Sequence, residues 1–176
     1  KYYYILSLSL LIVSCKSEPE KKNDQLKNVD NISATLSLAI PSYNFKELER
    51  LLYMNDDKTY VVNFWATWCA PCIKELPAFE KLNSNYKNEK VEVILVSLDF
   101  PNQLESKLIP FVKKRKIQSK VVLMIDPDQD IWIPKVNEKW SGAIPATLIY
   151  NKGKRQFYER SFTYQELKEE LQTFLK

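Results

Sequence analysis

The feature that most constrains the fold is an apolar segment that leads directly into a Cys-X-X-Cys sequence. Residues 60–64 are Tyr-Val-Val-Asn-Phe, a composition typical of a buried strand. Cys69 and Cys72 follow, and Ile73, Leu76 and Phe79 then recur at helical spacing. We therefore expect the two cysteines at a strand-to-helix turn, with Cys69 at the N-terminus of the helix.

The chain beyond this turn alternates between strand and helix patterns. Strands are predicted at 60–66, 91–98 and 121–125, helices from 70 to 82 and from 104 to 112, a hairpin at 146–150 and 155–160, and a last helix after residue 163. Residues 129–141 are predicted to be irregular. Thr163 and Glu166 form a capping box, and Leu167, Leu171, Phe174 and Leu175 would form the inner face of the last helix. This order predicts an α/β fold with a mixed sheet.

Two further elements are predicted before the first buried strand. Partial alternation over residues 32–40 indicates an edge strand that ends at Pro41. Asn44 is a candidate N-cap for a short helix with apolar residues at helical spacing up to Leu52.

The first 14 residues resemble an export signal that ends at a cysteine. The apolar run from Tyr2 to Val13 is too short for the ~20 residues that span a bilayer. It ends in Leu-Ile-Val-Ser before Cys15, which resembles the lipobox of bacterial lipoproteins. That resemblance implies cleavage before Cys15 and lipid attachment to its thiol. Plain secretory cleavage or an uncleaved anchor are the alternatives.

Residues 15–41 are then expected to form the lipidated N-terminus and a flexible tether, and residues 42–176 a single domain. Lys, Glu, Asn and Asp dominate residues 16–30, a composition that seldom packs. A lipid on Cys15 would hold the domain at a membrane outside the cytoplasm.

The composition excludes several classes of function. The chain has no histidine, which rules out histidine-based zinc, haem and copper sites as well as Ser-His and Cys-His catalytic pairs. Its net charge of +4 comes from mixed basic and acidic residues without a basic stripe, so no nucleic-acid partner is expected. The basic cluster at 113–116 is best explained as a helix end, where positive charge is favoured.

A Cys-X-X-Cys sequence at a helix N-terminus suits thiol-disulfide exchange. The helix dipole and free N–H groups favour the thiolate of Cys69, which attacks a partner disulfide, and Cys72 then displaces the partner. Pro71 stiffens the loop. A structural disulfide would close a longer loop to restrain the chain, and a zinc site needs about four ligands. The redox cycle requires no cofactor beyond the two thiols.

The segment from Phe64 to Cys72 resembles the active-site motif of thioredoxin-fold proteins, and its flanks resemble the TlpA/ResA-like branch of thiol-disulfide oxidoreductases. The resemblance extends over residues 42–176. It implies a thioredoxin-like fold, with a central mixed sheet flanked by helices on both faces. Residues 142–147 resemble the cis-proline segment of this family, which implies that the Ile144–Pro145 bond is cis and that this backbone binds the partner peptide.

Two polar residues carry a further expectation. Asn63 occupies the position of a buried acid in cytoplasmic thioredoxins, so proton transfer must come from another group. Glu75 matches a glutamate of the TlpA/ResA branch and lies one helical turn after Cys72. Partial burial would raise its pKa and make it the acid/base of the exchange. The alternative is a solvated, salt-bridged glutamate.

The four tryptophans are candidates for an apolar border of the site. Trp65 and Trp68 belong to the motif, with Trp68 assigned to substrate binding together with Pro71, Ile144 and Pro145. Trp132 and Trp140 fit core packing equally well.

The resemblance implies a protein-disulfide reductase that acts outside the cytoplasm. Its substrates would be protein disulfides or thiols, such as those of apocytochrome c, and a membrane electron donor would recharge it. The Ala-Pro pair between the cysteines is more typical of reducing than of oxidising members. A disulfide-forming oxidase or isomerase remains the main alternative. A metal-delivery module or a peroxidase fits the sequence less well.

Overall fold

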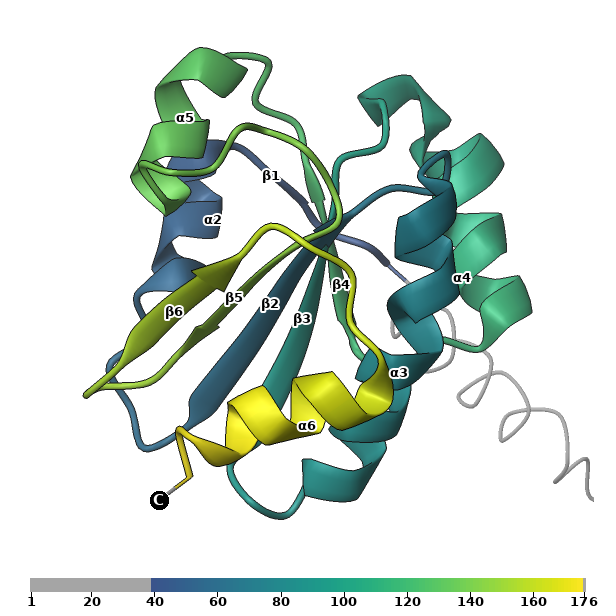
Figure 1. Ribbon diagram of the computed structural model, residues 1–176. Helices are drawn as coiled ribbons and strands as arrows, with labels where there is room; N and C mark the ends of the chain where they lie inside the picture. Colours follow the sequence, from purple (N-terminus) through teal and green to yellow (C-terminus); the bar gives the residue numbers. More distant parts are fainter. Residues whose placement is uncertain (1–38, 176) are drawn as a thin grey trace, which may run out of the picture. The chain divides into compact units, whose positions relative to one another are not determined.

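In the computed structural model, which describes residues 39–175, one mixed sheet is covered by helices on both faces (Figure 1). The strands are β1 (Ser42–Tyr43), β2 (Thr59–Trp65), β3 (Val91–Ser97), β4 (Lys120–Met124), β5 (Ala146–Tyr150) and β6 (Arg155–Tyr158). Their order across the sheet is β1-β4-β3-β2-β5-β6. Strands β1, β4, β3 and β2 pair in parallel, whereas β5 is antiparallel to both of its neighbours, β2 and β6. This confirms the predicted mixed sheet.

The helices divide between the two faces of the sheet. They are α2 (Phe45–Leu52), α3 (Ala70–Tyr86), α4 (Ile109–Arg115), α5 (Gln129–Val136) and α6 (Tyr164–Gln172), with a 3-10 turn η1 (Pro101–Gln103) and a π-helical turn η2 (Leu104–Leu108) before α4. Helices α3, α4 and α6 cover one face, and α2 and α5 cover the other (Figure 1).

Strand β2 is central and buried along its whole length. Because side chains alternate across a strand, Val61, Asn63 and Trp65 point to the α3 side, and Val62 and Phe64 point to the α2 side. The strand must therefore be apolar on both faces, and Asn63 is its single strongly polar interior residue. An unsatisfied amide at this depth would be costly, so its partners matter for the site.

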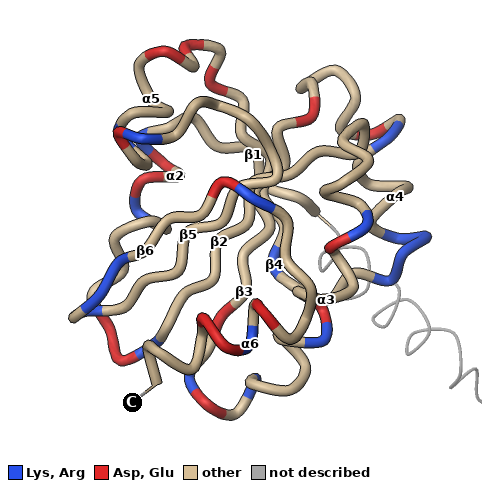
Figure 2. Tube along the Cα trace, viewed as in Figure 1, with Lys and Arg blue, Asp and Glu red and all other residues tan. Residues whose placement is uncertain are grey.

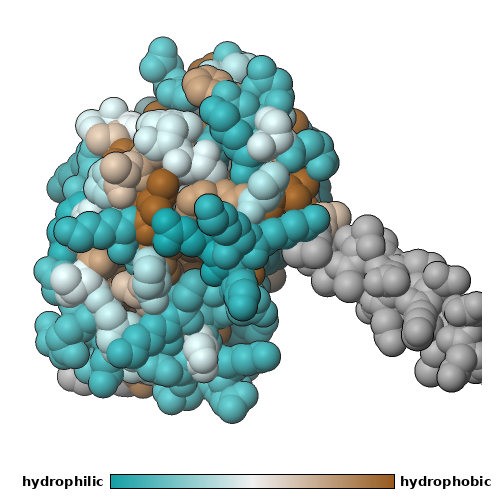
Figure 3. Space-filling model, turned by 90° about the vertical axis from the view of Figure 1, so that its right-hand side faces the viewer, coloured by the Kyte–Doolittle hydropathy of each residue, from teal (hydrophilic) through white to brown (hydrophobic). Residues whose placement is uncertain are grey.

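Local capping signals were confirmed. Asn44 and Glu47 form a reciprocal capping box at α2, and Thr163 and Glu166 form one at α6. The basic residues Lys113, Lys114 and Arg115 lie in the last turn of α4 and are exposed. The face formed by α3 and α4 is mainly hydrophilic, with a band of apolar atoms across its middle (Figure 3).

Two predicted elements were wrong. Residues 129–136 form α5 rather than an irregular segment, with Trp132 and Val136 buried one turn apart. Pro134 and the lack of a side-chain cap concealed this helix in the sequence. Leu175 is 39% exposed, so it does not belong to the inner face of α6, which ends at Gln172.

The first edge strand lies later than predicted. Residues 32–38 of the expected strand fall outside the described residues, and Ala39 and Ile40 are not in a strand. The strand that pairs with β4 begins after Pro41, at Ser42. The predicted signal peptide, Cys15 and most of the predicted tether also lie outside the described residues. Within residues 39–175, the helices are too short or too polar to cross a bilayer.

Candidate active site

The two cysteines form a disulfide at the N-terminus of α3. Cys69 is the N-cap residue, and Cys72 lies in the first turn of the helix. The Cys72 backbone N–H is 3.3 Å from Cys69 Sγ. After reduction, this N–H and the helix dipole would stabilise negative charge on the Cys69 sulfur. The expected strand-to-helix turn is therefore present, with Cys69 at its predicted position.

The two sulfurs differ in exposure. Cys69 is 6% exposed and Cys72 is fully buried. Thiol-disulfide exchange requires access to the attacked or attacking sulfur, so Cys69 is the residue that a partner can reach. Cys72 is placed to close the ring from inside.

The 142–147 segment lies against the outer sulfur. The Ile144–Pro145 peptide bond is cis, as the family resemblance implies, and Ile144 O is 3.7 Å from Cys69 Sγ. Gly142 has a φ of +92°, and a Cβ at this position would come within 3.2 Å of Ile133. Trp140 Nε1 donates to the Ala143 carbonyl at 2.8 Å. The segment is thus anchored on both sides of its turn.

The predicted substrate-binding residues are spread around Cys69. Trp68 is 57% exposed beside the disulfide, Pro71 is exposed in the first turn of α3, and Pro145 is buried at the start of β5. The expectation that Trp65 borders the site was wrong, and for Trp132 and Trp140 the core-packing alternative is confirmed. Trp65, Trp132 and Trp140 are at most 5% exposed and belong to the core on either side of the sheet.

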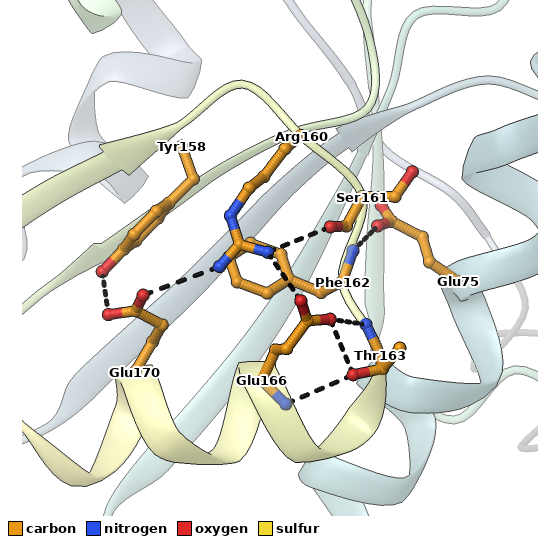
Figure 4. Close-up of polar contacts among 8 residues, drawn as sticks. All are labelled: Glu75, Tyr158, Arg160, Ser161, Phe162, Thr163, Glu166 and Glu170. Carbon is orange, nitrogen blue, oxygen red and sulfur yellow. Dashed lines mark hydrogen bonds and ion pairs between the residues drawn. The ribbon is translucent and has the colours of Figure 1, made fainter.

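Glu75 is buried directly behind the redox turn. It is 4% exposed, which excludes the solvated-glutamate alternative. Asn63 Nδ2 donates to its Oε1 at 2.8 Å. The Phe162 backbone N–H donates to its Oε2 at 2.9 Å, as Figure 4 shows. Burial raises the pKa of Glu75 to about 7, and the two hydrogen bonds oppose this rise by stabilising the carboxylate.

The segment that supplies the Phe162 N–H is held by a network at the start of α6 (Figure 4). The Arg160 guanidinium lies over the Phe162 ring at 4.0 Å and pairs with Glu166 and Glu170 at 3.3 and 3.6 Å. Tyr158 Oη donates to Glu170 at 2.6 Å. We call residues 160–163 the Glu75 strap.

A second buried carboxylate, missed in the sequence, anchors the redox turn from the opposite side. Asp99 is 2% exposed. Its oxygens accept hydrogen bonds from the Thr67 backbone N–H at 3.0 Å, from the Thr67 hydroxyl and from Ser97 Oγ. Asp99 comes just after β3, and the carboxyl ends of adjacent parallel strands meet at one edge of a sheet. That placement was the signal that could have identified it.

Three features together define a thioredoxin-fold thiol-disulfide protein. They are a mixed sheet with parallel central strands, a redox-active Cys-X-X-Cys at a helix N-terminus, and a cis-proline beside the outer sulfur. Comparison with known proteins agrees. The AhpC/TSA family model matches residues 34–155, and the chain belongs to this family.

Curated relatives of the chain include thiol-disulfide oxidoreductases. The chain is 35% identical to the thiol-disulfide oxidoreductase ResA of Oceanobacillus iheyensis over 77 residues, which is 40% of each chain. It is 30% identical to ResA of Bacillus thuringiensis over 119 residues, which is 68% of this chain and 62% of the relative. These matches span 40% and 62% of the relatives' own length. The expected resemblance to the ResA-like branch is confirmed.

Solved structures show the same fold. StoA from Bacillus subtilis superposes with a TM-score of 0.51 and 26% identity, covering 65% of this chain and 83% of that one. A thioredoxin family thiol:disulfide interchange protein from Chlorobium tepidum gives a TM-score of 0.57 at 20% identity, covering 68% and 81%. The predicted thioredoxin-like fold is therefore confirmed.

Proposed function

We propose that the protein is an extracytoplasmic thiol-disulfide oxidoreductase that reduces disulfides in partner proteins. The observation that carries this proposal is the Cys69–Cys72 disulfide at the N-terminus of α3, with its outer sulfur against the Ile144 carbonyl. The Cys69 thiolate attacks one sulfur of a partner disulfide and releases the other as a thiol. Cys72 then attacks Cys69 in the mixed disulfide. Two electrons and two protons pass to the partner.

Glu75 is proposed as the acid/base of this cycle. Cys72 must lose its proton before it attacks the mixed disulfide, and it is buried, so bulk water does not reach it. Glu75 lies one turn further along the same helix and is connected to β2 through Asn63. A carboxyl with a pKa of about 7 can accept and return a proton near neutral pH.

The direction of electron flow is tested by redox titration against glutathione. Thioredoxin has a midpoint potential of about −270 mV, whereas that of the oxidant DsbA is about −120 mV. A potential below about −200 mV together with reduction of a protein disulfide such as insulin supports the reductase. A potential close to that of DsbA would favour the oxidase or isomerase instead.

The location and clients belong to the same proposal. The lipobox-like sequence before Cys15 supports a lipid anchor in the bacterial cell envelope, with the domain facing the periplasm or cell surface. Secreted proteins, apocytochrome c among them, would be the substrates, and a membrane electron donor would restore the dithiol. Cys15→Ala should release the full-length protein from membranes, and retention in the membrane fraction would contradict lipid anchoring.

A further inference from the structure

Large apolar side chains are exposed at the end of the sheet that carries the disulfide. Trp68 follows β2, Phe100 follows β3, Ile125 follows β4 and Ile131 lies at the start of α5, and their exposed fractions range from 38% to 60%. Parallel strands place Trp68, Phe100 and Ile125 at one edge, and Ile131 follows in α5. Exposed apolar surface next to a reactive group is typical of an interaction site.

A groove lies among the loops after β3 and β4 and the start of α5, and Phe100 and Ile125 are among its lining residues. It has a volume of about 290 Å³ and is lined by residues 98–101 after β3, residues 124–127 after β4, and Gln129 and Trp132 of α5. This is close to the lower limit of ligand pockets, ~300 Å³, and so suits a side chain better than a cofactor. Asp99 forms part of the wall and hydrogen-bonds Thr67, two residues before Cys69.

The order of strands places this groove and the cis-proline segment on opposite sides of Cys69. The redox turn follows β2, the groove lies beyond β3 and β4, and Pro145 precedes β5 on the other side. A polypeptide whose cysteine sits over Cys69 and contacts Ile144 therefore passes Trp68 and reaches the groove with its other flank. Because β3 is the direct neighbour of β2, the loop after β3 that lines the groove lies next to the redox turn.

The walls of the groove are acidic although the whole chain carries a net charge of +4. Segments 97–104 and 124–134 contain Asp99, Asp126, Asp128 and Asp130 and no Lys or Arg. Asp128 and Asp130 are exposed, and acidic positions gather where the chain enters α5 (Figure 2). Such a rim attracts a basic partner and repels an acidic one.

We propose that this groove binds a large apolar side chain of the substrate polypeptide, close in sequence to the target disulfide and accompanied by Lys or Arg. The inference rests on the proposed function and adds a substrate class to it: extended segments in which a cysteine is flanked by apolar and basic residues. The exchange itself is unchanged. The protein dithiol becomes a disulfide, and the substrate disulfide becomes two thiols.

The test uses three synthetic peptides whose single cysteine is joined to glutathione. The first carries Leu and Lys on both sides of the cysteine, the second has Ser in place of Leu, and the third has Glu in place of Lys. We expect the reduced protein to release glutathione from the first peptide about tenfold faster than from the second, because burial of one large apolar side chain contributes at least one order of magnitude in affinity. The third should be slower than the first, and this difference should shrink at high salt.

Variants of the groove give the matched comparison. Phe100→Ser and Ile125→Ser should each lower the ratio of the first peptide's rate to the rate with hydroxyethyl disulfide, a small neutral substrate. Leu175→Ser is the control, because this residue is also exposed but lies beside Phe174, which contacts Asn151 at the far end of β5. Its ratio should match that of the unmodified protein.

Other outcomes separate the two proposals. Equal rates for all three peptides with active reduction of hydroxyethyl disulfide would overturn the groove and leave the reductase intact. Failure to reduce any of these disulfides would overturn the reductase itself. A dimer in solution that Phe100→Ser converts to a monomer would also overturn the inference, since a second copy would then occupy the groove.

Discussion

The side-chain amide of Asn63 donates a hydrogen bond to the carboxylate of Glu75 at 2.8 Å, and both residues are buried between β2 and α3. Asn63 Nδ2 also lies 3.2 Å from Thr147 Oγ1, on the strand that follows the cis-proline. A polar chain thus connects β5, the central strand and the helix that carries both cysteines. The ionisable member of this chain is Glu75.

Glu75→Gln should slow disulfide exchange by about tenfold or more near neutral pH, since general acid/base groups typically contribute at least that much. The rise in rate across pH 7, where Glu75 changes protonation, should disappear. The measurement is the pH–rate profile for reduction of a peptide disulfide from pH 5 to 9. Glu80→Gln, on the same helix, is the control and should keep the shape of the profile. An unchanged profile in Glu75→Gln would leave this residue with a structural role alone.

Loosening the Glu75 strap should move this profile toward higher pH. Arg160, Glu166 and Glu170 are between 31% and 47% exposed, so their ion pairs contribute little to global stability and the variants should fold. Arg160→Gln should weaken the hydrogen bond from the Phe162 N–H to the Glu75 carboxylate. Because this hydrogen bond stabilises the carboxylate, the pKa of Glu75 should rise. The apparent pKa from the pH–rate profile measures this rise.

The direction in which a second variant shifts the pKa of Glu75 separates an effect of the strap's position from a direct effect of charge. Lys74 and Lys81 of α3 and Glu166 of α6 line the same hollow as Glu75, so through-space effects act on it as well. Glu170→Gln removes a negative charge, which by itself would lower the pKa of Glu75, whereas release of the strap would raise it. A rise in both variants supports the strap. A fall in Glu170→Gln would show that charge alone acts on Glu75.

Glu75 should also make the stability of the oxidised protein depend on pH. Its pKa is about 7 in the folded chain against an ordinary value of 4.5, so between these values the folded state retains a proton that the unfolded state has lost. The contribution of Glu75 to the free energy of unfolding is therefore largest below pH 4.5 and falls as pH rises through 7. The full effect is on the order of 3 kcal/mol.

Urea unfolding at several pH values measures this effect. The free energy of unfolding of Glu75→Gln should lack the decrease that the unmodified protein shows between about pH 4.5 and pH 7, since the glutamine does not titrate. Parallel pH dependence in both proteins would contradict the raised pKa of Glu75.

The sequence predicted the parts of this site that depend on local chemistry. The capping boxes at Asn44 and Thr163 involve residues three positions apart, and the redox turn is defined within a few residues of Cys69. The network around Glu75 was only partly predictable. Helical spacing places Glu75 near Cys72, whereas its contact with Phe162 joins positions 87 residues apart.

Other features depend on tertiary packing. Nothing in the sequence distinguishes Trp65, Trp132 and Trp140 from exposed aromatic residues that border a site. Strand alternation and the position of α5 bury all three. The sequence alone does not distinguish Asp99 from the other acidic residues. Only the pairing of β3 with β2 brings Asp99 to Thr67. Such residues are identified by the sheet order, which long-range contacts determine.

The two cysteines have different roles in the proposed cycle, and these roles can be separated directly. Cys72→Ser should accumulate a mixed disulfide between Cys69 and a substrate peptide, because the resolving thiol is missing. Cys69→Ser should form no such adduct, since its remaining thiol is buried. Mass spectrometry of each variant after incubation with an oxidised peptide measures the adduct. A stable adduct in Cys72→Ser alone is the predicted result, whereas an adduct in Cys69→Ser, or peptide reduction by it, would contradict the mechanism.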